Sequence, residues 1–217
     1  MFENLFNKNE KNKQFESYQH TFTDGTEFVV TVVHNEYHFV ISDAENNTFD
    51  LARLVKGSIQ FAYSSNDEWM ATVDEVGKSS IQFGKFTEIR DILSLLHEIG
   101  HVNNVIDTQL ALDAQQKYSQ KKYSAGIHSE KMERVRLLYE AHDLTKISER
   151  NAWAFALRSI RSIEKRMNVT LQEDLGSSAE IRQYIERHLH QYEESAQEEM
   201  SVLSEESIQK ILGDPSN

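Results

Sequence analysis

The chain has 217 residues and a formal net charge of −12, with 39% hydrophobic and 27% charged residues. This composition is typical of a folded globular protein, and the acidic balance disfavours nonspecific binding to nucleic acid or to anionic membranes. Cysteine is absent, which excludes disulfides, cysteine nucleophiles and cysteine-ligated zinc.

The distribution of apolar residues also predicts the cellular location of the protein. No run approaches the roughly 18 apolar residues that a transmembrane helix needs, and the first ten residues lack the apolar core of a signal peptide. We therefore expect a cytoplasmic protein without a membrane or nucleic-acid partner. Residues 1–15 are rich in Asn, Lys and Glu and are expected to form a mobile lead-in.

A β pattern dominates residues 16–84. The expected strands are rich in β-branched and aromatic residues. Asp24-Gly25 is a hairpin signal in front of the strand expected at residues 28–33. The pattern predicts an antiparallel meander of about five or six short strands, with one or two helical turns within residues 50–56. The clearest strands are expected at residues 28–33, 37–41, 58–63, 69–73 and 80–83.

A helical pattern follows in residues 85–167. Strands followed by helices predict an α+β domain over residues 16–167, with the helices packed on one face of the sheet. After the segment around residue 97, further helices are expected at residues 107–120, 129–144, 146–167, 178–198 and 204–212, with breaks at Gly126 and Gly176.

Residues 168–217 are expected to form an acidic helical extension. Ile181, Ile185 and Leu189 form an apolar stripe in it. Such a stripe indicates either packing on the core or a docking helix for a partner or a second copy of the chain. His188 and His190 are two residues apart, which places them on different faces of a helix, and we expect both to be solvated.

Residues 97–101 read His-Glu-Ile-Gly-His within a segment of helical periodicity. On a helix, positions i and i+4 lie on one face, so His97 and His101 can direct both imidazoles at one zinc ion. Glu98 then lies beside the ion, where its carboxylate can take a proton from a zinc-bound water. The spacing predicts a zinc hydrolase, most often a peptidase. Gly100 weakens the helix by about 1 kcal/mol relative to alanine, yet it allows another backbone to approach closely.

A catalytic zinc site takes three protein ligands, and Glu149 is the first candidate for the third. It begins the stretch Glu-Arg-Asn-Ala-Trp-Ala-Phe-Ala. On a helix, Glu149 shares a face with Ala152, Trp153 and Ala156, and the small alanines let this helix pack closely against the one that carries the histidines. A second helix that delivers a glutamate is the gluzincin arrangement.

Asp107 is the alternative third ligand. The stretch from His97 to Asp107 resembles the metzincin pattern H-E-x-x-H-x-x-G-x-x-H/D, with Asn104 at the glycine position. Asparagine tolerates the left-handed conformation that this turn needs. Metzincins also carry a methionine turn, whereas Met132 lies in a helical pattern. We favour Glu149 and keep Asp107 open.

The two motifs together resemble the ImmA/IrrE-like group of bacterial metallopeptidases, which pairs an H-E-x-G-H helix with a downstream E-x-x-A-N-x-F-A helix. The matching residues are His97-Glu98-Ile99-Gly100-His101 and Glu149-x-x-Ala152-x-x-Phe155-Ala156. Trp153 stands where the group has asparagine, and the interval between the motifs is long. The resemblance covers only these motifs. It implies a distant zincin relative: a cytoplasmic zinc peptidase that makes limited cuts in protein substrates.

We therefore expect a zinc metallopeptidase in which His97, His101 and Glu149 hold Zn²⁺ and Glu98 polarises the water. An edge strand directly upstream of the motif, at residues 80–83, is expected to align an extended peptide by strand addition. Two alternatives stay open: a zincin-like binding or regulatory module without peptidase activity, and a zinc hydrolase that acts on a non-peptide amide. The intact Glu98 weighs against the binding module, because a structural metal site has no use for a base.

Overall fold

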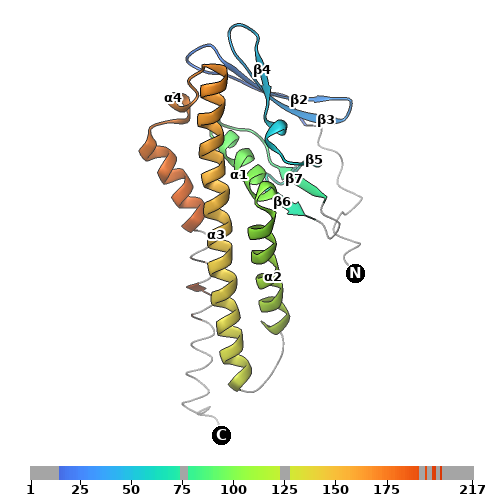
Figure 1. Ribbon diagram of the computed structural model, residues 1–217, viewed down its shortest axis with the longest axis vertical. Helices are drawn as coiled ribbons and strands as arrows, with labels where there is room; N and C mark the ends of the chain where they lie inside the picture. Colours follow the sequence, from blue (N-terminus) through green and yellow to red (C-terminus); the bar gives the residue numbers. More distant parts are fainter. Residues whose placement is uncertain are drawn as a thin grey trace.

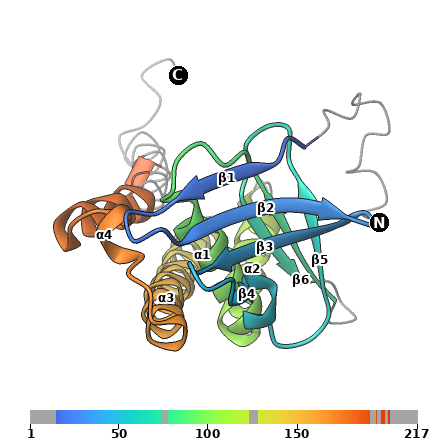
Figure 2. The same cartoon turned by 90° about the horizontal axis from the view of Figure 1, so that it is seen from above.

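The computed structural model describes residues 15–73, 78–122, 128–190, 194, 197–198 and 201. Strands come first and helices follow, which confirms the predicted α+β class. Two sheets cover one end of the helices, as Figures 1 and 2 show. The lead-in up to residue 14, the predicted break at Gly126 and the predicted helix at 204–212 lie outside the described residues.

The first sheet is the predicted antiparallel meander, with strand order β1-β2-β3-β4. Gly25 has a φ of 85° in the turn between the first two strands, a conformation that glycine adopts without a steric penalty. His34 and Asn35 both have positive φ, as a two-residue hairpin turn requires. The strands are β1 (Tyr18–Thr21), β2 (Glu27–Val33), β3 (Glu36–Ser42) and β4 (Thr48–Asp50). A predicted helical turn follows as η1 (Leu51–Leu54).

The second sheet differs from the prediction of one continuous antiparallel meander. It consists of β5 (Ile59–Tyr63), β6 (Met70–Val73) and β7 (Ser79–Phe83) in the order β5-β7-β6. Strand β7 lies between the other two, parallel to β5 and antiparallel to β6. The expectation that residues 80–83 form an edge strand is therefore wrong, and β6 is the edge beside the helices. Alternation of side chains is the same in parallel and antiparallel strands, so the sequence pattern could not distinguish them.

An aromatic cluster around Phe83 joins the two sheets to the start of the helical region. Phe83 is fully buried, and its ring lies 4.8 Å from that of Tyr37 and 5.2 Å from that of Phe39, between centroids. Phe15 contacts Tyr37 and Phe83 edge-on, so this residue belongs to the core and not to the lead-in. The cluster fixes β7, and with it β6, against the helix that follows.

The helices are α1 (Asp91–Asn103), α2 (Val105–Lys122), α3 (His128–Met167) and the short α4 (Gln172–Leu175), with a further helix at 178–190. Helix α3 runs without interruption for 40 residues, where the sequence pattern predicted two helices. Because no glycine or proline lies within it, nothing terminates it locally. Helices α2 and α3 lie side by side as a long hairpin that extends away from the sheets (Figure 1).

The start of the predicted acidic extension packs on the core. Gly176, with a φ of 103°, separates α4 from the helix at 178–190. Ile181, Ile185 and Leu189 all join the main hydrophobic cluster, which is the first of the two alternatives stated for this stripe. No helix in the described part of the chain is long and apolar enough to span a membrane.

Candidate metal centre

Helices α1 and α3 meet closely at Gly100. A Cβ atom at this position would lie 2.8 Å from both the Cα and the carbonyl oxygen of Ala152, which is closer than such atoms approach in proteins. Only glycine permits this contact, as the sequence predicted. Glu149 lies about one turn before Ala152 on α3, and the contact therefore brings its carboxylate to the two histidines of α1.

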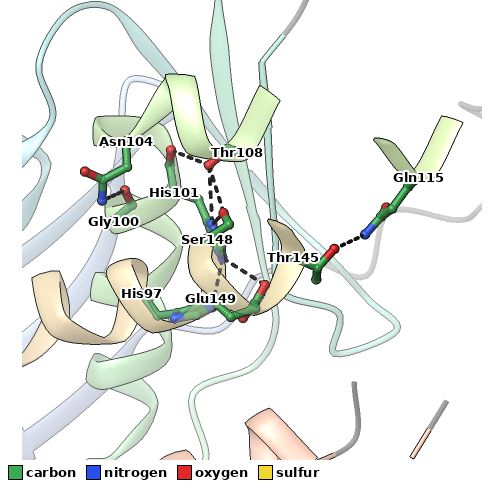
Figure 3. A network of polar contacts seen from close by, with 9 residues as sticks. All are labelled: His97, Gly100, His101, Asn104, Thr108, Gln115, Thr145, Ser148 and Glu149. Carbon is green, nitrogen blue, oxygen red and sulfur yellow. Dashed lines mark hydrogen bonds and ion pairs between the residues drawn. The ribbon is translucent and has the colours of Figure 1, made fainter. Parts of the chain in front are cut away.

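Three side chains converge at this crossing, as Figure 3 shows. His97 Nε2 lies 3.0 Å from His101 Nε2 and 3.1 Å from Glu149 Oε2, and His101 Nε2 lies 3.3 Å from Glu149 Oε1. All three residues are buried. A four-coordinate zinc ion with bonds of about 2.0–2.1 Å needs ligand atoms about 3.3 Å apart. The buried group could therefore hold a metal ion.

Two buried atoms of this group lack a hydrogen-bond partner. Glu149 Oε2 is near His97 Nε2, but no donor hydrogen is directed at it, and His97 Nδ1 is also unpaired. A buried carboxylate oxygen without a donor is unfavourable. A cation between Glu149 and the histidines would remove that penalty, so the donor set fits a metal.

The protonation states of His97 and Glu149 suit metal binding. Burial lowers the pKa of His97 to about 4, so its imidazole is neutral at pH 7. Burial alone would raise the pKa of Glu149, but the close His101 and His97 rings outweigh that effect and lower the pKa to about 2. The site thus offers a neutral imidazole and an ionised carboxylate, which are the forms that coordinate metals.

Glu98 lies beside this group on α1 but is not one of its members. Burial raises the pKa of its carboxyl to about 7, although the charge of His101 and the nearby backbone N–H of Ala71 oppose the shift. A carboxyl group with a pKa near neutrality can both accept and return a proton. Glu98 also lines a cleft together with His101 and Glu149.

Hydroxyl groups orient the ring of His101. Its Nδ1 lies 3.2 Å from Ser148 Oγ and 3.5 Å from Thr108 Oγ1, and the Thr108 hydroxyl also donates to the His101 carbonyl at 3.0 Å. Such contacts fix which ring nitrogen carries the proton and where the other nitrogen points. Neither residue was predicted from the sequence, because no motif marks them; the position of Ser148 directly before Glu149 was the one available signal.

His97 is held differently, by a stack of aromatic rings. The ring of Trp153 lies 4.2 Å from that of His97, between centroids, and contacts Tyr184 and His188 on its other sides. Trp153 therefore supports His97 by packing at the position where the resembled group has asparagine. The expectation that His188 is solvated is wrong, because it is half-buried against this stack, whereas His190 is exposed as predicted.

Asp107 lies outside the group of three. It is in the first turn of α2, and its carboxylate accepts a hydrogen bond of 2.8 Å from the Asn151 amide. Helix α1 ends at Asn103, and its C-cap residue Asn104 has a φ of −107°, which is not left-handed. The turn that the metzincin pattern needs is thus not formed, and the structure places Glu149, not Asp107, beside the histidines.

Comparison with protein-family models, with curated proteins and with solved structures finds no match to this chain. The resemblance to the ImmA/IrrE-like group therefore stays a prediction from the two sequence motifs.

The close contact at Gly100 leads to a test of the helix crossing. In a free helix, Gly100→Ala would stabilise by about 1 kcal/mol, but here the added methyl group must displace the Ala152 backbone. We expect a net loss of about 1–3 kcal/mol in the free energy of unfolding, measured by urea denaturation. A more stable variant would show that α1 and α3 do not pack this closely.

Proposed function

We propose that this chain is a zinc-dependent metallopeptidase that hydrolyses peptide bonds in a protein substrate. The observation that carries the proposal is the convergence of His97, His101 and Glu149 next to a cleft that Glu98, His101 and Glu149 line. The cleft lies between β6 and the helices, and its lining consists of Trp69, Met70, Ala71, Glu98, His101, Thr108, Ala111, Leu112, Gln115, Thr145, Ser148 and Glu149.

Each residue of the site has a distinct task in this proposal. Zinc held by His97, His101 and Glu149 would supply a Lewis acid that polarises the scissile carbonyl and activates water. The carboxylate of Glu98 accepts a proton from the attacking water as the new C–O bond forms. It then gives the proton to the leaving nitrogen as the C–N bond breaks. Ser148 and Thr108 keep His101 in the orientation that binding requires.

Strand β6 is suited to align an extended peptide. One of its edges pairs with β7, and among the described strands the other edge has no neighbour. Met70 and Ala71 of β6 line the cleft, so a peptide added along this edge would pass beside Glu98.

The test is hydrolysis of an unfolded, fluorescein-labelled protein by the chain loaded with one equivalent of zinc after removal of metals. We expect labelled peptides to be released only with zinc, and not by His97→Ala. His190→Ala is the matched control, because His190 is an exposed histidine away from the group of three. Stoichiometric zinc without cleavage would favour the binding module, and absence of zinc binding would overturn the proposal.

A further inference from the structure

The two walls of the cleft present apolar side chains to solvent. Met70 on β6 is 48% exposed and Leu112 on α2 is 42% exposed, and both line the cleft together with Trp69, Ala71 and Ala111. Exposed apolar side chains that gather at one concave site are typical of a surface that binds a ligand.

The hydroxyl groups on the helical side of the cleft are already engaged. The hydroxyls of Thr108 and Ser148 face His101, and Thr145 Oγ1 accepts a hydrogen bond of 2.8 Å from the Gln115 amide (Figure 3). Thr108, Thr145 and Ser148 are also buried. These hydroxyls are therefore poorly placed to select a polar substrate side chain.

The charges around the cleft exclude acidic side chains. Among the described residues, its ionisable lining residues are Glu98, His101 and Glu149, and no lysine or arginine lines it. A substrate aspartate or glutamate would enter next to the carboxyl groups of Glu98 and Glu149, with no basic side chain of the lining to pair with, which is unfavourable.

We infer that the cleft selects, in an extended peptide, an apolar side chain such as Leu, Met or Phe next to the scissile bond, and that Met70 and Leu112 make this selection. In an extended chain alongside β6, successive side chains point in opposite directions. One of them therefore enters between the two walls while its neighbours point away. The inference depends on the proposed peptidase function and names its substrate class: unfolded protein segments with an apolar residue at the cut.

The test measures binding separately from cleavage. Zinc-loaded Glu98→Gln protein is titrated into fluorescein-labelled decapeptides that differ only at a central Leu, Asp or Lys, and affinity is read from fluorescence anisotropy. We expect the Leu peptide to bind about tenfold or more tightly than the Asp peptide. Adding Leu112→Glu should remove the preference for Leu and favour the Lys peptide.

The matched control is Leu110→Glu, which makes the same change on the same helix. Leu110 is 48% exposed and does not line the cleft, so this variant should retain the preference for Leu. Equal affinities for the Leu and Asp peptides, no binding of any peptide, or equal effects of the two variants would overturn the inference. Cleavage by the native chain separates the two proposals: cleavage without apolar preference rejects the selection alone, and apolar binding without cleavage rejects the peptidase alone.

Discussion

Replacement of Glu98 by glutamine is expected to lower kcat/KM for peptide hydrolysis about 100- to 10,000-fold and to leave one zinc ion per chain. Glutamine has nearly the same shape as glutamate, but its amide cannot accept a proton from water. Glu98 is not one of the three grouped residues, so the metal ligands remain. The two measurements are the rate of peptide release and the zinc content by elemental analysis.

Two controls make the Glu98 result specific. Glu140→Gln makes the same change at an exposed position of α3 that pairs with Arg136, and it should leave both measurements unchanged. Equal urea denaturation curves for the two variants would show that the fold is intact. Retained hydrolysis in Glu98→Gln would remove the proton-transfer role from this residue. Loss of zinc would show instead that Glu98 supports the metal directly.

Glu149→Ala is expected to weaken zinc binding by at least about 100-fold, beyond the roughly 10- to 100-fold effect of losing a hydrogen-bond partner of a ligand. The variant leaves two imidazoles and removes the ionised carboxylate that lies 3.1 Å and 3.3 Å from them. Competition with a zinc chelator of known affinity gives the change. Ser148→Ala should show the smaller effect, because the Ser148 hydroxyl contacts His101 and not the metal position.

Asp107→Ala is the matched control for the third ligand. The Asp107 carboxylate is engaged by Asn151, so the variant should retain the zinc affinity of the native chain. Zinc binding that depends on Asp107 and not on Glu149 would reverse the ligand assignment and favour the metzincin-like alternative.

The part of the site that lies on one helix could be predicted from the sequence. His97 and His101 face the same way because an α-helix repeats every 3.6 residues, and Glu98 accompanies them on the same helix. Gly100 indicated a close contact between helices, because glycine destabilises a helix interior and a close backbone contact can compensate for that loss. The change from alternating to helical periodicity near residue 85 likewise indicated the α+β class.

The remaining features depend on contacts between residues far apart in the chain. Glu149 and Asp107 were both acceptable third ligands by spacing, and the contact between Gly100 and Ala152 placed Glu149 at the site. The insertion of β7 between β5 and β6 left β6 as the edge strand beside Glu98. Periodicity reports only which face of an element is buried. Which element covers that face depends on how whole sets of side chains pack together, and no local pattern records it.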